Sequence, residues 1–522
     1  MRIIRALKTV NYKLFFALFI TMLLPAVYQA VRIFFLGDFP DDSGVNIASQ
    51  LAWVNMIYEV IYEILIVPLC FLLGKSLADK VVFSNKVRTG LFVTAAVYCV
   101  MSALMALFAE PLVVLMAQNE SLIAETVSYV RLEAVAILFG TLWKFTTLVL
   151  SMLHRLRYLY IVLGVQMVLS VLSDTFLISA LPVSLGLGVN GIAITDIGVN
   201  FILVALAVIF LHREGIPVFA RGWDFSWLKE WFRVGKFSGL EGLLRNVAYL
   251  VMIMRLINII EEQGNYWIAE SFITQWLLMP SLALGDLVKK EVGAHRECVR
   301  EKSFGYFSLA AIFAVLWLVS IPLWKPILQY GLNVADYETV YYIVLLQTGF
   351  YITYIFNHCV MDSTFYGLGK TQYLVIQSIL IDVVYYGLMF ILYLAGIFVP
   401  NLTDICLMFG VGMLLNFLPT LVQYLRLLKN EGIKIDFRLD GTEPEDVIAK
   451  YSVPMPASEP SEGIEELSAA EQPLTEAPAS RSVSEPDPLP ASANAGEDIP
   501  MSEKEGECAA ADGGKTEPND KG

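Results

Sequence analysis

Long apolar runs without a charged residue constrain this chain more than any other feature of its sequence. Residues 91–108, 158–173 and 305–324 contain no Asp, Glu, Lys or Arg. Only 16% of the 522 residues are charged, whereas soluble chains carry roughly a quarter. This excludes a soluble enzyme and a nucleic-acid-binding module, and it predicts an all-α integral membrane protein embedded in the lipid bilayer.

Twelve apolar segments are each long enough to cross a bilayer as a helix. The connection 212–236 is the longest and divides them six and six. We therefore expect an N-lobe over 1–211, a cytoplasmic linker over 212–236 and a C-lobe over 237–428. The expected spans are 14–36, 50–74, 89–109, 125–152, 158–181, 189–211, 237–260, 266–288, 304–326, 339–361, 373–397 and 402–425.

The distribution of basic residues predicts the orientation. If both ends of the chain are cytoplasmic, the intracellular stretches before residue 373 hold 21 Lys and Arg, and the extracellular side holds one, Lys325. Because positively charged loops stay in the cytoplasm, this asymmetry favours a multi-pass protein of the plasma (cell) membrane with both termini cytoplasmic.

Residues 439–522 differ in composition from the apolar body. They contain 20 acidic and 5 basic residues, together with 11 of the chain's 22 prolines. Such a segment cannot bury enough apolar surface to offset the entropy of ordering it. We expect a disordered acidic cytoplasmic tail, which is either dispensable or a docking segment for an unidentified partner.

Two glycine-rich stretches carry a family resemblance. Residues 185–195 read LGLGVNGIAIT and residues 366–371 read YGLGKT. Both resemble segments of the MATE (multidrug and toxic compound extrusion) family of the MOP flippase superfamily, and the pattern is most similar to its DinF-like branch. The resemblance implies two six-helix bundles around a central cavity. It also implies multidrug efflux of amphiphilic compounds by antiport with H⁺ or Na⁺.

Ionisable residues at bilayer depth are expensive, so they mark a transport pathway or a compensated pair. In the second expected span, Asn55, Glu59, Tyr62 and Glu63 fall on one helical face, with Tyr58 beside them. Two carboxylates one turn apart repel each other, and such a pair suits a proton or an organic cation. The alternative is that both pair with an arginine from another span.

The fifth and sixth expected spans carry further polar residues. Ser170 and Asp174 stand where the resembling family has the Asn and Asp of a proton-linked site, and Thr195 matches a polar Thr of that site. Asp196 and Asn200 follow Thr195 on the sixth span. The resemblance therefore implies an ion-coupling role for Asp174 and Thr195.

Arg32 departs from the family pattern. It stands where the family often has a coupling aspartate in the first span, and an arginine does not deprotonate in proteins. We expect a fixed ion pair between Arg32 and one of the N-lobe acids Asp174, Glu59 or Glu63. The alternative is that Arg32 extends to the outer membrane surface.

The C-lobe has its own set of candidates. Glu241 and Arg245 are four residues apart and can neutralise each other, and Glu270 can pair with Arg255 across two helices. His358, one turn before Asp362, can relay a proton near neutral pH. Asp382 is a lone intramembrane acid. The aromatic residues expected to wall the cavity are Tyr58, Tyr62, Tyr351, Tyr354 and Trp276.

These observations favour a monomeric secondary transporter of small amphiphilic molecules, with no catalytic residue. The sequence has no Walker A loop, and its histidines and cysteines have no metal-ligand spacing, so we expect no cofactor beyond a transported H⁺ or Na⁺. One alternative is a flippase of a lipid-linked saccharide, whose pyrophosphate would bind Arg32, Arg245 and Arg255. Another is a scaffold or receptor-like protein that signals through its tail. Removal of residues 439–522 distinguishes the two, because a transporter should retain transport without the tail.

Overall fold

The described part of the chain is entirely helical in its regular secondary structure. The computed structural model describes residues 2–38, 43–74, 76, 79–153, 156–218, 220, 222–370 and 372–435. The acidic tail expected over 439–522 therefore lies outside the described residues.

The helices of the first half precede the connection that begins near residue 214. They are α1 (Arg2–Leu7), α2 (Tyr12–Leu36), α3 (Ser43–Ser49), α4 (Leu51–Leu65), α5 (Leu69–Gly74), α6 (Lys80–Leu107), α7 (Ala109–Leu115), a 3₁₀ turn (Glu120–Leu122), α8 (Ile123–Met152), α9 (Leu156–Leu177) and α10 (Asn190–Arg213).

The second half begins at α11 and contains five π-helical segments. Its elements are α11 (Leu228–Tyr249), π Leu250–Met254, α12 (Arg255–Ile259), α13 (Gln263–Phe272), π Ile273–Leu277, α14 (Met279–Ala294), α15 (Cys298–Pro326), π Ile327–Gly331, α16 (Tyr337–Phe356), π Asn357–Asp362, α17 (Ser363–Gly367), α18 (Gln372–Ser378), π Ile379–Tyr385, α19 (Tyr386–Leu394) and α20 (Leu402–Asn430).

Ten helical segments of the described chain are long and apolar enough to cross a membrane. An eleventh is obtained if α13 and α14, which are bent by 57° at their junction, count as one span. That bent pair corresponds to the expected span 266–288. The expected span 50–74 departs most from a continuous helix, because the chain leaves the helix at Leu65 and re-enters one at Leu69.

Pro68 explains the break between α4 and α5. Proline has no backbone N–H and clashes with the preceding turn, so α4 ends at Leu65. The end of α4 is stabilised by the first turn of α11, since the Trp231 indole N–H donates to the Leu65 carbonyl oxygen at 2.7 Å. Trp231 is buried and stacks on Trp227 with ring centroids 4.8 Å apart. The Trp-rich stretch of the connection thus packs into the protein.

The bond to Leu65 leads to a first prediction. Trp231→Phe keeps an aromatic ring in place but removes the indole N–H, so the protein should lose about 1 kcal/mol of unfolding free energy. Reversible denaturation in detergent micelles measures this loss. The matched control is Trp223→Phe, because Trp223 is 42% exposed and should tolerate the change. An equal loss in both variants would mean that the bond has no special role.

The turn between α9 and α10 sets the register of two helices that carry candidate residues. Gly186 and Gly188 adopt φ values of +59° and +63°, which glycine reaches without strain. This conformation lets the backbone N–H groups of Leu185 and Leu187 donate to the last carbonyls of α9, at 2.8 and 2.9 Å. The glycine-rich stretch singled out in the sequence is therefore a tight hairpin that brings the end of α9 against the start of α10.

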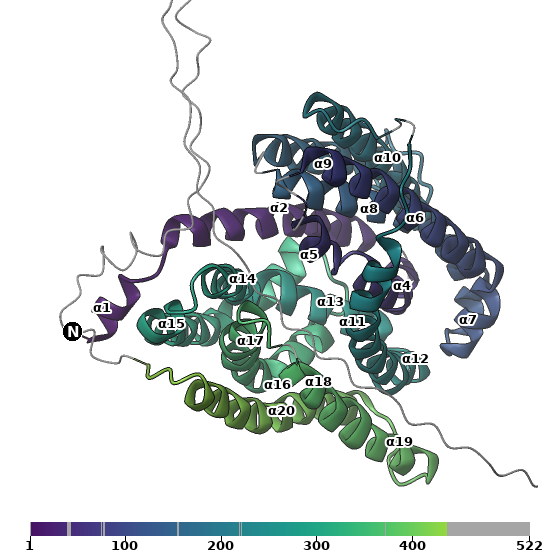
Figure 1. Ribbon diagram of the computed structural model, residues 1–522. Coiled ribbons are helices and arrows are strands. Elements are labelled where there is room, and N and C mark those ends of the chain that lie inside the picture. Colours follow the sequence, from purple (N-terminus) through teal and green to yellow (C-terminus); the bar gives the residue numbers. More distant parts are fainter. Residues whose placement is uncertain are drawn as a thin grey trace, which may run out of the picture. The chain divides into compact units, whose positions relative to one another are not determined.

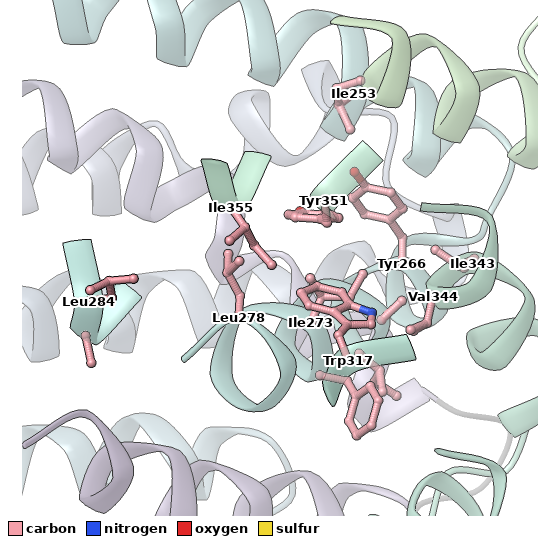
Figure 2. Packing of buried hydrophobic residues seen from close by; sticks show 14 of the residues in the cluster. Ile253, Tyr266, Ile273, Leu278, Leu284, Trp317, Ile343, Val344, Tyr351 and Ile355 are labelled. Atoms are coloured by element: carbon pink, nitrogen blue, oxygen red, sulfur yellow. The ribbon is translucent and has the colours of Figure 1, made fainter. Parts of the chain in front are cut away.

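The largest apolar cluster is built mainly by the second half, but it includes side chains of α2 such as Phe15 and Leu36. Figure 2 shows its aromatic members Tyr266, Trp317 and Tyr351 among aliphatic residues. The rings of Trp317 and Tyr351 stack with centroids 6.1 Å apart. Two smaller clusters are built mainly by the first half. Helix α2 packs against α9 of the first half and α14 of the second half.

The start of α4 is tied to α12 by buried amides. The Gln50 amide nitrogen donates to the Asn258 side-chain oxygen at 2.8 Å, and the Asn258 amide nitrogen donates back at 3.1 Å. Asn258 also donates to the Met116 carbonyl at 2.8 Å, and the Trp53 indole donates to Gln50 at 2.8 Å. Figure 1 shows α4 beside α11, with which it packs over much of its length.

Candidate functional site

A cavity of about 450 Å³ lies among helices α2, α4, α8, α9 and α10. Trp267 and Gln275 of the second half complete its wall. The structure brings five sequence-predicted residues to this wall, namely Arg32, Asn55, Ser170, Asp196 and Asn200. Asp174 and Thr195, which are 1% and 2% exposed, are buried next to it. We call this space the first-half cavity.

Arg32 is the centre of the charge arrangement at this cavity. Its Nε donates to Asp174 Oδ2 at 3.0 Å, while Nη1 and Nη2 donate to the two oxygens of Asp196 at 3.0 and 2.7 Å. The Asp196 contact is bidentate, the geometry in which a guanidinium binds a carboxylate most strongly. The expected ion pair with Asp174 is confirmed. The alternative placement at the outer membrane surface is wrong, since Arg32 is only 6% exposed.

Asp196 is a second partner of Arg32 that the sequence did not pair with it. Asp174 comes from α9 and Asp196 from α10, so the hairpin between these helices delivers two acids to one guanidinium. The side chain of Asp196 is 24% exposed, whereas that of Asp174 is 1% exposed. Asp174 is therefore the fully buried partner of Arg32, and Asp196 is the partner that is accessible from the cavity.

Glu133 of α8 also lines the first-half cavity, and the sequence analysis missed it. It is 2% exposed and its neighbours include Tyr129, Arg32, Asp174 and Asp196. The signal that could have found it is a lone acid in the middle of an apolar span, the pattern that singled out Asp382. The site thus contains three acids and one arginine.

Glu59 and Glu63 do not belong to this group. Arg245 of α11 donates to a carboxylate oxygen of Glu63 and lies 3.5 Å from Glu59 Oε1. The alternative in which both acids pair with an arginine from another span is therefore the arrangement seen. Glu241, the partner expected for Arg245, has its side chain outside the described residues.

The aromatic candidates of the first half have different surroundings. Tyr58 is buried, stacks on Tyr98 with centroids 5.8 Å apart and donates to Ser102. It therefore belongs to the packed interior and not to a cavity wall. Tyr62 lies under the ammonium of Lys144, which is 5.5 Å from the ring centroid.

A second cavity, of about 410 Å³, is lined by candidate residues of the C-lobe and by Glu59 of α4. Glu59, Arg245, Tyr354, His358 and Asp382 line it together with Asp362. The Nδ1 atom of His358 lies 3.5 Å from Asp362 Oδ2, and the Tyr354 ring stacks on the His358 ring at 4.8 Å. A π-helical segment spans residues 357–362 and presents His358 and Asp362, a feature frequent at functional sites.

Glu270 has a different partner from the one expected. Tyr351 donates its hydroxyl to Glu270 Oε2 at 2.5 Å, and Arg255 donates to the carbonyl of Leu115 at 3.0 Å. The expected Arg255–Glu270 pair is wrong, because Arg255 extends towards the end of α7. Trp276 is 37% exposed.

A further buried ion pair lies in the connection between the expected spans 266–288 and 304–326. Lys302 Nζ is 2.9 Å from Glu291 Oε1, and neither side chain is exposed at all. The Tyr306 hydroxyl donates to the other oxygen of the same carboxylate. Glu291 lies near the end of α14 and Lys302 near the start of α15. Among the described residues, no group of three or more His, Cys, Asp or Glu side chains is placed to hold a metal ion.

The same fold occurs in solved membrane transporters, although no family model and no curated protein matches the chain. A mutant of the Vibrio cholerae MATE transporter VcmN aligns with a TM-score of 0.57 at 16% identity, over 83% of this chain and 99% of that one. A MOP superfamily transporter from Pyrococcus furiosus, described as having a binding pocket of reverse polarity that suggests a different function, gives 0.57 at 16%, over 81% and 96%. An inward-facing multidrug resistance MATE transporter gives 0.53 at 17%, over 80% and 95%.

These similarities establish the fold. The expected fold class, an all-α membrane protein of the MATE type, is confirmed by them and by the membrane-spanning helices of the described chain.

Proposed function

We propose that this chain, which has the fold of the MATE and MOP superfamily transporters, is a secondary active transporter. It exports amphiphilic cationic compounds in exchange for H⁺ or Na⁺. The observation that carries the proposal is the first-half cavity, where Arg32, Asp174, Asp196 and Glu133 are brought together from four membrane-spanning helices. We place the protein in the plasma membrane as a monomer with both termini in the cytoplasm.

The charge balance of the cavity supports a cationic cargo. Three acids against one arginine leave the group with a surplus of negative charge when all are ionised. A proton or Na⁺ that enters from outside removes part of this surplus, and a cargo cation that enters from inside does the same. Because both relieve the same electrostatic imbalance, their binding is mutually unfavourable, which is the requirement for antiport.

The arginines argue against the flippase alternative. A pyrophosphate head group needs cationic side chains that are open to the cavity. Arg32 is occupied by two aspartates, Arg245 by Glu59 and Glu63, and Arg255 by a backbone carbonyl. The arrangement therefore favours a positively charged cargo.

Neutral isosteres of the acids test the proposal. In vesicles that contain the purified protein, a proton gradient should drive efflux of a cationic dye. Asp174→Asn should reduce this efflux to the rate of protein-free vesicles, because it frees Arg32 from its fully buried partner. Glu59→Gln and Glu63→Gln should each slow it, because they loosen the contact of α4 with α11. The matched control is Glu110→Gln, at an exposed position on α7.

Detergent-solubilised variants should first elute as single species, so that a loss of efflux is not a loss of folding. Unchanged efflux in all three variants would overturn the assignment of these carboxylates to transport.

A further inference from the structure

Glu133 is a buried acid with an incompletely satisfied carboxylate. It is 2% exposed, it faces the first-half cavity, and its Oε1 has no hydrogen-bond partner. Its closest neighbour on the same helix is the Tyr129 hydroxyl, one turn earlier. Buried polar atoms are almost always paired, so an open carboxylate oxygen at a cavity wall indicates a ligand that comes and goes.

The charged neighbours of Glu133 do not neutralise it. Arg32 on α2 donates its hydrogen bonds to Asp174 on α9 and to Asp196 on α10. These aspartates repel a negative charge on Glu133, and the remaining titratable neighbours, Tyr28 and Tyr129, are neutral at ordinary pH.

Lys144 lines the same cavity, but it follows Glu133 by three turns of α8, or about 16 Å along the helix axis. Arg32 is therefore the only cation close to Glu133 among the described residues of the cavity wall, and it is already engaged.

We propose that Glu133 binds the coupling proton of the transporter. This inference rests on the proposed function and names the residue that performs its ion-coupling step. In the closed cavity, burial and the two aspartates favour the neutral carboxylic acid. When water or a cationic cargo enters the cavity, the ionised form becomes favourable and the proton leaves from the open oxygen. Asp174 and Asp196 are both hydrogen-bonded to Arg32, which leaves Glu133 as the acid of this group without a cationic partner.

A proton fits this position better than Na⁺. A sodium ion needs several oxygen ligands around it at once. A proton forms a covalent bond to a single oxygen, and Oε1 of Glu133 is available for it.

Infrared difference spectroscopy of the purified full-length protein tests the proposal without any substrate. Against the carbonyl bands of the chain's many other carboxyls, one band, that of the protonated Glu133 carboxyl, should appear in acidic buffer and vanish in alkaline buffer. It should be absent in Glu133→Gln and retained, slightly shifted, in Glu133→Asp. Glu125→Gln is the matched control, because Glu125 lies exposed on the same helix. A band that survives in Glu133→Gln, or one that does not respond to pH in the wild type, would overturn the proposal.

A transport assay is the second test of the role of Glu133. Glu133→Gln should bind a cationic dye as the wild type does, yet lose stimulation of efflux by a pH gradient completely, while Glu133→Asp retains it. Normal stimulation in Glu133→Gln would overturn the proposal. If the wild type transports no dye but the titrating band is still lost in Glu133→Gln, then Glu133 stands as the proton site and the proposed export function fails.

Discussion

Replacement of Arg32 by methionine should lower the free energy of unfolding by about 3–5 kcal/mol, because it leaves the buried Asp174 and the partly exposed Asp196 without their cation. The two carboxylates accept three hydrogen bonds from this one guanidinium. Methionine fills a similar volume, so the loss should come from charge and hydrogen bonding and not from a cavity. Reversible unfolding in mixed micelles, followed by tryptophan fluorescence, measures the change.

The control for Arg32→Met is Arg131→Met. Arg131 is exposed and donates only to the backbone carbonyl of Ala106, so its replacement should change stability by less than about 0.5 kcal/mol. Adding Asp196→Asn to Arg32→Met should recover part of the loss, since one uncompensated charge disappears. Equal effects of the two arginine substitutions would contradict the role of Arg32 as a buried counter-ion.

The second large effect is expected at Lys302. Lys302→Met should cost about 3–5 kcal/mol, because the carboxylate of Glu291 would remain buried without its cationic partner. The matched control is Lys325→Met, which breaks an ion pair with Glu338 whose side chains are 43% and 59% exposed. That exposed pair contributes only about 0–1 kcal/mol. The same unfolding measurement compares the two variants.

A double variant separates charge from packing at this pair. Lys302→Met with Glu291→Gln removes both charges and leaves an acceptor for the Tyr306 hydroxyl, so it should regain most of the stability lost in Lys302→Met alone. If the double variant is as unstable as the single one, the loss comes from packing and the uncompensated carboxylate is not its cause.

The membrane-spanning helices could be predicted from the sequence because a bilayer imposes length and apolarity on each span. The expected spans 189–211 and 402–425 correspond to α10 and α20 almost end to end. The prediction was less accurate where local chemistry interrupts an apolar run. Pro68 divides the span 50–74, and the junction of α13 with α14 bends the span 266–288. An apolar run predicts that a segment is buried in the membrane or the protein, but it does not predict where the helix bends or breaks.

The candidate site was predicted only in part, for a physical reason. A sequence places Arg32 and Asp174 at a depth in the membrane, but the pairing of two helices depends on their rotation and register. The pair with Asp174 was expected, whereas the bidentate contact with Asp196 was not. Glu133 was missed although it shows the pattern that singled out Asp382, a lone acid within an apolar span. Glu291 and Lys302 lie between the expected spans 266–288 and 304–326, where only the folded structure shows that they are buried.

Helix α4 is fastened to the second half at both ends, which constrains how the two halves can separate. Gln50 ties its start to Asn258 through neutral amides, and Glu63 ties its end to Arg245 through opposite charges. The fastenings lie about 20 Å apart along the helix. If one of these two contacts breaks while the other is kept, α4 can only rotate about the contact that remains. Ionic strength and membrane voltage act on charges, so they can weaken the Glu63–Arg245 contact but not the Gln50–Asn258 contact. Separation of the two halves at the Arg245 end should therefore depend on salt and voltage, whereas separation at the Gln50 end should not.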